Sequence, residues 1–327
     1  MNYYIRRFET QNGMSTQVWK IDACSAVRVG VANPEGGPGT YFRANPGESI
    51  WDALRRMTPW FEAEETPFHE TVLKPGEYYP RMARPTDQYP DQAPGLSPGA
   101  QREADTIAIG HGQLRALTRQ LDRICQTVHP TRDTFATYGH DIRNLLILAC
   151  TEVESHWRGV LVANGVTRDH FSTKTYVKLS AAMRLDSYAV SFPSYPWLEP
   201  VSPFLGWGTS GNPSQGLAWY DAYNAAKHNR ENEFARSTLE NAFGAVTACA
   251  IMIAAQFGRP LALGQSSDLR SFFNFSSMPT WPLSDVYIFP YGEGKTDWTE
   301  VKYPFDARWY WPNAEDPLPF IRGRRAG

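Results

Sequence analysis

Hydrophobic residues recur at helical spacing through the middle of the chain. In the first such segment, between residues 101 and 130, apolar positions three, four or seven apart form one stripe: Ile107, Leu114, Leu117, Leu121 and Ile124. The same spacing predicts further helices over 134–163, 173–185, 215–228 and 232–257, and a short one over 49–57. The apolar run 242–257 is shorter than the roughly 20 residues that a membrane span needs. We therefore expect a core helix and no membrane partner.

Toward both termini the pattern changes to short segments that alternate with a period of two. Residues 16–21 and 26–31 are typical of half-buried strands. Residues 284–289 and 298–303 have the same character, and Gly292-Glu293-Gly294 between them suits a hairpin turn. We expect these C-terminal segments to pair with the N-terminal strands. The predicted class is α+β, with an antiparallel bundle of about five helices flanked by small β elements from both termini.

Two proline-rich stretches interrupt these patterns. The stretch 78–100 contains five prolines and no hydrophobic period, which predicts a linker or an extended arm. The stretch 191–213 contains five more prolines and five large aromatic residues, and a loop of this length is often functional. Its aromatic side chains either cover a helix face or bind a partner protein, for which the candidates are Trp197, Phe204 and Trp207. The expected regions are 1–77 (β-rich or mixed), 78–100 (arm), 101–258 (bundle) and 259–327 (hairpin and basic tail).

Composition narrows the class of protein. The 327 residues carry 32 Lys and Arg against 34 Asp and Glu, and 42% are hydrophobic, which excludes disordered, collagenous and disulfide-scaffold proteins. A net charge of −2 gives the whole chain no electrostatic preference for nucleic acid or membrane. The four cysteines are widely spaced without a CxxC, so we expect buried free thiols. Because no apolar run follows the charges after Met1, we expect no secretory signal and a cytoplasmic location.

The densest polar cluster lies at 219–231, near the end of a predicted helix. On that helix Asp221, Asn224 and His228 share one face, while Tyr223 and Lys227 lie on the adjacent stripe with Tyr220. A histidine beside Lys227 and Arg230 can exchange a proton near neutral pH while the cations stabilise phosphate charge. The structural alternative is that the helix dipole favours these cations, with Tyr223 and Asn224 tying down the proline-rich loop.

A second cluster, Glu152, Glu154 and His156, raises the question of a metal site. Glu152 and His156 are four residues apart and share a face, whereas Glu154 is expected to point away toward Arg158. One glutamate and one histidine do not supply the ligands of a di-metal bundle, so we expect no metal and no cofactor. Instead, we expect Glu152 to enter the bundle and pair with the group of Tyr223, Asn224 and Lys227, because a buried charge requires a partner.

The pattern Trp-Tyr-x-x-Tyr-Asn-x-x-Lys-His-x-Arg at 219–230 resembles bacterial members of the HEPN superfamily. Upstream, Asp141 to Trp157 is similar to the long acidic-motif helix of those proteins, and the likeness covers about 105–258. The resemblance implies an antiparallel helical bundle, usually a homodimer. Many members are metal-independent ribonucleases of toxin–antitoxin or antiviral systems, and others are inactive binding modules.

One feature departs from that family. Active members carry an arginine separated from the catalytic histidine by four to six residues, and here the corresponding positions hold Asp221, Ala222 and Tyr223. The resemblance gives His228 the catalytic role, with Lys227 or Arg230 in place of the arginine. Two functions stay open: an RNA-acting defence effector, or a non-catalytic interaction module. The candidate residues are His228, Lys227, Arg230, Asn224 and Tyr223 for catalysis, with Glu152 and Asp221 in support.

Overall fold

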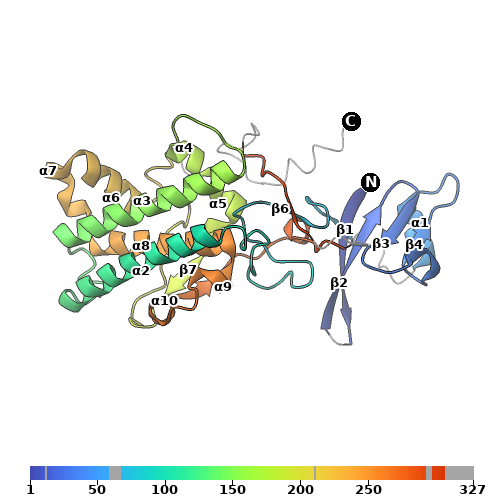
Figure 1. Ribbon diagram of the computed structural model, residues 1–327, viewed down its shortest axis with the longest axis horizontal. Coiled ribbons are helices and arrows are strands. Elements are labelled where there is room, and N and C mark those ends of the chain that lie inside the picture. Colours follow the sequence, from blue (N-terminus) through green and yellow to red (C-terminus); the bar gives the residue numbers. More distant parts are fainter. Residues whose placement is uncertain (12, 59–67, 210, 292–296, 306–327) are drawn as a thin grey trace. The chain divides into compact units, whose positions relative to one another are not determined.

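The computed structural model describes residues 1–11, 13–58, 68–209, 211–291 and 297–305, and it divides into two compact units. The sheet unit comprises 1–78, 84–92 and 280–301. The described part of the helical unit comprises 79–83, 93–279 and 302–305 (Figure 1). Strands dominate the first unit and helices the second, which confirms the predicted α+β class.

The sheet unit is built on a five-stranded antiparallel sheet with the strand order β4-β3-β2-β1-β5. Its strands are β1 (Asn2–Thr10), β2 (Gly13–Ile21), β3 (Ser25–Arg28), β4 (Tyr41–Arg43) and β5 (Phe68–Glu70). The first two strands pair in register from Asn2 opposite Ile21 to Thr10 opposite Gly13. The predicted strand 16–21 lies within β2, and the predicted strand 26–31 overlaps β3.

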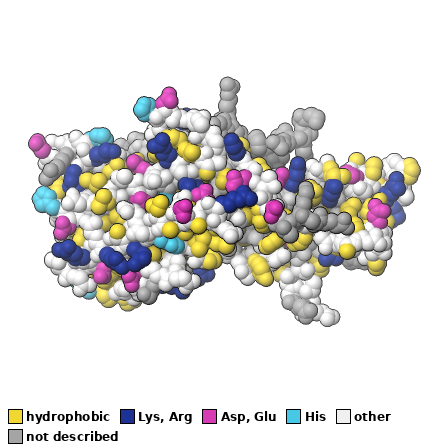
Figure 2. Space-filling view, in the orientation of Figure 1, with side chains coloured by type: hydrophobic (Ala, Val, Ile, Leu, Met, Phe, Trp, Pro, Cys, Tyr) yellow, Lys and Arg dark blue, Asp and Glu magenta, His cyan; other side chains and the backbone are white. Residues whose placement is uncertain are grey.

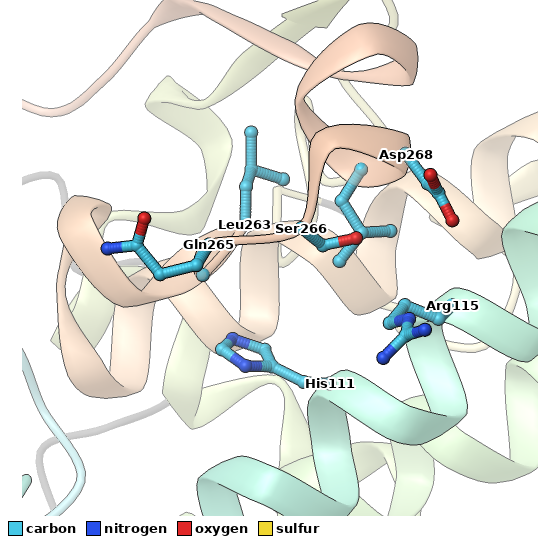
Figure 3. A pocket seen from close by; sticks show the side chains of 8 residues that line it. His111, Arg115, Leu263, Gln265, Ser266 and Asp268 are labelled. Carbon is cyan, nitrogen blue, oxygen red and sulfur yellow. The ribbon is translucent and has the colours of Figure 1, made fainter.

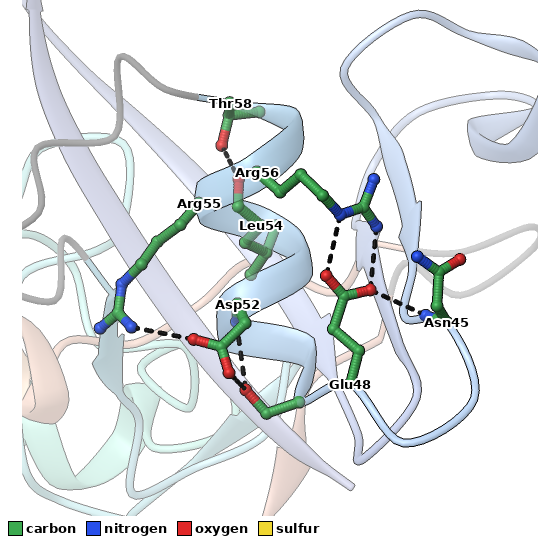
Figure 4. A network of polar contacts seen from close by, with 8 residues as sticks. Asn45, Glu48, Asp52, Leu54, Arg55, Arg56 and Thr58 are labelled. Atoms are coloured by element: carbon green, nitrogen blue, oxygen red, sulfur yellow. Dashed lines mark hydrogen bonds and ion pairs between the residues drawn. The ribbon is translucent and has the colours of Figure 1, made fainter.

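One face of the sheet packs against α1 (Ile50–Met57), the predicted short helix. Ser49 caps it by accepting a hydrogen bond from the Asp52 amide at 3.1 Å. The preceding turn is held by Glu48, whose carboxylate accepts from Arg56 at 2.8 and 2.9 Å and from the Asn45 amide at 2.9 Å (Figure 4). The bonds from Arg56 are the main reason that the pKa of Glu48 falls to about 2.

The other face of the sheet is covered by a C-terminal segment. Alternation along β2 puts Trp19 in the cluster under α1 and Val18 in a second cluster with Trp281, Val286 and Ile288. The predicted strand 284–289 is therefore wrong. Its first part is the 3-10 turn η4 (Leu283–Asp285), and the rest is extended chain whose Tyr287 bridges Thr86. The described part of the sheet unit contains one other 3-10 turn, η1 (Pro34–Gly36).

The predicted C-terminal hairpin is not formed by the described residues. β9 (Thr299–Glu300) pairs in parallel with β6 (Glu77–Tyr78), so it does join the N-terminal half of the chain as expected. Its partner is nevertheless not 284–289, and the proposed turn at 292–294 lies outside the described residues. A parallel pair requires a long connection between its strands, which hydrophobic alternation alone does not reveal.

Four long helices lie side by side in the helical unit (Figure 1). They are α2 (Ala104–Thr127), α3 (His140–Ala163), α6 (Ala218–His228) and α8 (Leu239–Phe257). Among the described residues, α8 alone is long and apolar enough to span a membrane, but 89% of that apolar window is buried among its neighbours. The predicted core helix is thus confirmed, and its burial is consistent with a soluble protein.

Shorter elements complete the helical unit, and the expected count of about five helices holds only in part. The predicted helix 173–185 divides into α4 (Thr173–Tyr176), α5 (Lys178–Met183) and η2 (Leu185–Ser187). The predicted helix 232–257 divides into α7 (Arg230–Glu233), η3 (Phe234–Arg236) and α8. The second break comes from Thr238, whose hydroxyl caps α8 by accepting from the Asn241 amide at 3.3 Å. The remaining elements are α9 (Arg259–Ala262), α10 (Ser267–Phe272), and the antiparallel pair β7 (Ala189–Ser191) and β8 (Asn274–Ser277).

The aromatic loop 191–213 folds into the core, which corrects two of the predicted partner-binding residues. Phe204 is 0% and Trp207 3% exposed, and the Trp207 ring stacks on Trp157 at 4.8 Å. Both side chains bury apolar area against α3 and are closed to a partner. Trp197 alone of the three stays accessible, with 52% exposure.

The proline-rich arm 78–100 has buried residues in both units, although Tyr89 and Leu96 along it are more than half exposed. Tyr79 and Ala83 are buried in the helical unit, where the Ala83 amide donates to the Ala255 carbonyl at 2.8 Å. Residues 84–92 belong to the sheet unit, so the arm is divided between the two units and is no free linker. The described residues of the predicted C-terminal region 259–327 are divided in the same way, with 280–291 and 297–301 in the sheet unit and 259–279 and 302–305 in the helical unit.

Three of the four cysteines are buried free thiols, as predicted. Cys249 donates to the Ala149 carbonyl at 3.3 Å across the contact between α8 and α3. Cys24 is exposed, and the prediction of burial is wrong there because it lies in the turn between β2 and β3.

Candidate functional site

α6 is an amphipathic helix whose buried face anchors the predicted site. Trp219, Tyr220 and Tyr223 are each at most 4% exposed. The Trp219 indole donates to the Pro203 carbonyl at 2.9 Å, so Trp219, rather than Tyr223 or Asn224, ties the proline-rich loop to the helix. These contacts fix the phase of α6 and thereby direct the last turn of the helix outward.

The last turn of α6 presents His228 and Lys227 to solvent. α6, α7 and the first turn of α3 lie at one end of the helical unit (Figure 1). His228 has no hydrogen bond or ion pair with any residue that the structure describes, so its ring nitrogens are open to a ligand. The helix C-terminus also carries partial negative charge, which favours cationic side chains there.

Lys227 is a fixed cation at this helix end. Its Nζ donates to the Tyr223 hydroxyl at 3.0 Å and lies 5.1 Å from the centroid of the same ring. The hydrogen bond that Lys227 donates to the Tyr223 hydroxyl is the main reason that the pKa of Lys227 rises above its ordinary value. Tyr223 therefore orients the ammonium group next to His228, and this role is consistent with its prediction as a site residue.

Arg143 is a candidate site residue that the sequence pattern did not predict. It lies in the first turn of α3, and its NH2 donates to the Ala226 carbonyl in the last turn of α6 at 3.2 Å. The guanidinium thus contacts the helical turn that carries Lys227 and His228. Its Nε is buried without a hydrogen-bond partner among the described residues. This arginine comes from another helix 83 residues earlier, so no local motif could identify it.

A second histidine belongs to the same end of the bundle. His140 opens α3 and is exposed, and its ring lies 5.0 Å from the Phe234 ring, which follows α7. Tyr138, with 51% exposure, contacts the same phenylalanine at 5.8 Å. Figure 2 shows Lys, Arg, His and acidic side chains interspersed over this end of the helical unit, at the left of the view.

The remaining predicted residues of α6 and α7 have different surroundings. Asp221 forms an ion pair with Arg236, which also lies 3.5 Å from Glu233, so Asp221 contacts the segment that follows α6. Asn224 is half-buried on the same helix. The backbone of Arg230 begins α7, and its side chain lies outside the described part of the structure.

Glu152 does not join this group, which corrects the prediction. Its Oε1 lies 3.4 Å from His156 Nε2, and His156 Nδ1 accepts from the Gln256 amide at 2.9 Å in the bundle core. Burial lowers the pKa of His156 to about 4 and raises the pKa of Glu152. The glutamate that meets α6 is Glu154, which accepts from the Tyr220 hydroxyl.

Helix geometry explains why Glu154, and not the predicted Glu152, contacts α6. Residues two positions apart on a helix point about 200° apart, so Glu152 and Glu154 face opposite neighbours. α3 lies between α8 on one side and α6 on the other, and each glutamate takes the polar partner on its own side. Across the described ranges, no three His, Cys, Asp or Glu side chains come close enough to hold a metal ion.

No family model, curated protein or solved structure matches this chain.

Proposed function

We propose that the protein cleaves RNA without a metal ion, using His228 at the end of α6. The observation that carries this proposal is an exposed, unpartnered imidazole on the helical turn that also holds Lys227 and is contacted by Arg143. Burial of that turn would have excluded a phosphate, and the turn is open. Arg143 supplies the positive charge that active HEPN members obtain from an arginine before the catalytic histidine, which is absent ahead of His228.

The chemistry follows from these groups. In metal-independent cleavage the ribose 2′-oxygen attacks the adjacent phosphorus and the bond to the 5′-oxygen breaks, leaving a 2′,3′-cyclic phosphate and a 5′-hydroxyl. His228 takes the proton of the 2′-hydroxyl, and His140 returns a proton to the departing 5′-oxygen. Lys227 and Arg143 stabilise the negative charge that builds up on the phosphate oxygens.

The resemblance to the HEPN superfamily supports the same proposal and extends it. It adds an antiparallel HEPN-like bundle, a homodimer, a role in toxin or antiviral defence, and action in the cytoplasm. The position of Arg143 differs from the family pattern, because this cation contacts the last turn of α6 from α3, whereas the family's arginine precedes the histidine in sequence. Light scattering on the purified chain tests the dimer independently of activity.

The test is cleavage of labelled RNA in excess EDTA by wild type, His228→Ala and His170→Ala. His170 is exposed and outside the site, so His170→Ala is the matched control. We expect His228→Ala to lower the rate by about 10²–10⁴-fold, the usual contribution of a general base. Arg143→Gln is expected to lower it by about 10²-fold or more through lost charge stabilisation. Equal rates in His228→Ala and wild type, or no cleavage of any RNA by wild type, contradict the proposal.

A second candidate is a non-catalytic module that binds a partner protein through Trp197. This side chain is 52% exposed, packs against the His129 ring at a tilt of 31° with ring centroids 4.9 Å apart, and donates to the Pro130 carbonyl at 2.7 Å. A rigid, exposed tryptophan is a typical interface anchor. If Trp197→Ala abolishes co-purification of a cellular protein that His228→Ala retains, this function is supported.

A further inference from the structure

A polar hollow of about 470 Å³ lies between α2 and the loop that joins α9 to α10, apart from the residues of the proposed RNA site (Figure 3). His111 and Arg115 line it from one face of α2, four residues apart. The loop residues Leu263, Gln265 and Ser266 line the opposite side. Its size falls in the range of small-molecule sites.

The loop that forms this wall is held in place without a ligand. The His111 Nε2 donates to the Leu261 carbonyl, and Arg270 donates to the Gly264 carbonyl through Nε at 3.0 Å and NH2 at 2.8 Å. Gly264 has a φ of +55°, and a Cβ there would meet the His111 ring at 2.9 Å. Glycine therefore permits both the turn and the close approach of the imidazole.

Several donors that face the hollow are unused. The side chains of Arg115, Gln265 and Ser266 have no hydrogen-bond or ion-pair partner in the described part of the chain. Figure 3 shows the Arg115 guanidinium and the His111 ring projecting from α2 toward the loop. The acidic residue of the lining, Asp268, already has a counter-ion in Arg119 at 3.4 Å. An unbalanced positive charge therefore remains at Arg115.

We propose that this hollow binds a small organic anion, with a phosphate or carboxylate on Arg115 and Ser266 and an apolar body against Leu263 and Leu269. A guanidinium binds planar pairs of anionic oxygens through two parallel hydrogen bonds. Leu269 is 1% exposed and gives the hollow an apolar base. This inference is independent of RNA cleavage and shares no residue with that site.

The test uses three probes that share a phenyl ring: phenyl phosphate, benzoate and the neutral benzyl alcohol. Titration calorimetry on the full chain, with ligand-observed NMR, measures each affinity. We expect at least one anion to bind about 10-fold or more tightly than benzyl alcohol, and the better anion identifies the headgroup. No binding of either anion below about 10 mM, or equal affinity for all three probes, overturns the proposal.

Three variants assign the effect to the hollow. Arg115→Gln is expected to weaken the anion by about 10-fold or more, and Asp268→Asn to tighten it by about two- to three-fold, because it removes a repelling charge. The matched control is Arg123→Gln, an exposed arginine two turns further along α2. An unchanged affinity in Arg115→Gln, with the helical circular dichroism of wild type, overturns the site.

Discussion

His156 and His228 belong to the same helical unit and have opposite surroundings. His156 is 7% exposed, accepts a hydrogen bond from Gln256, and has a pKa lowered by burial to about 4. His228 is exposed at the end of α6 and has no partner among the described residues. In the sequence the two look alike, because each is a histidine on a predicted helix with charged residues nearby.

The difference shows that burial, more than residue type, assigns the role of a histidine. In the core, the neutral ring of His156 is a packing and hydrogen-bonding group between α3 and α8. It cannot serve as a base for a substrate that never reaches it. At the end of α6 the same ring stabilises little, and it is available for proton transfer.

The largest effect on stability is expected from removing the buried ring. His156→Ala leaves a cavity and removes one of the two acceptors of the Gln256 amide, the other being the Met252 carbonyl, so the free energy of unfolding should fall by about 4 kcal/mol. His228→Ala is the control, with an expected loss below about 1 kcal/mol. Urea denaturation followed by circular dichroism measures both. Similar losses of stability in the two variants would contradict the claim that His156 stabilises the core and His228 does not.

Acid pH should act through the same buried ring. The unfolded chain binds a proton on His156 near its ordinary pKa of 6.5, whereas the folded chain does so only near 4. Stability should therefore be complete above pH 6.5 and fall by up to about 3 kcal/mol as the pH drops to 4. Glu152 opposes part of this loss, because its raised pKa lets the folded state bind a proton first.

The control for the pH experiment is His156→Gln, which keeps a polar side chain but does not titrate. Glu152, Arg81 and Glu103 remain in both proteins, so their contribution cancels in the difference. Thermal melting between pH 4 and 7 should give a flatter profile for the variant. Parallel profiles for the variant and wild type would mean that His156 is not the group responsible.

A smaller effect is expected at the contact between α3 and α6. Tyr220→Phe removes the hydroxyl that donates to Glu154, and Tyr220 is 4% exposed, so we expect a loss of about 1.5 kcal/mol. Tyr223→Phe should cost less, since its partner Lys227 is exposed and can bind water instead. Chemical denaturation of both variants checks the order, and the reverse order would contradict it.

The smallest effect is expected at the surface ion pair of Asp221 and Arg236. Their side chains are 29% and 43% exposed, so Asp221→Asn should change stability by no more than about 0.5 kcal/mol. High salt should remove the difference because it screens exposed charges. A salt-independent loss above about 1 kcal/mol would instead assign Asp221 a structural role in placing α7.

Prediction from the sequence succeeded where a residue and its local neighbours decide the outcome. Continuous apolar character over 242–257 implied burial, and α8 is buried. The spacing of Lys227 and His228 near a helix end implied their common turn. Prediction from the sequence failed at Glu152 and Glu154. Helical spacing shows that they lie on opposite faces of the helix, but it does not show which neighbouring helix packs against each face. Prediction also failed at Phe204 and Trp207, because an aromatic side chain in a loop suits a core and an interface equally.

The sequence alone determined the α+β class, the apolar core helix and the polar helix end, since these depend on periodicity and on side chains within one or two turns. The tertiary structure alone decided that Arg143 contacts the last turn of α6 and that the C-terminal segment covers the sheet. Both contacts join residues far apart in the chain, and their free energy comes from burial and hydrogen bonding between elements. That information is absent from any local pattern.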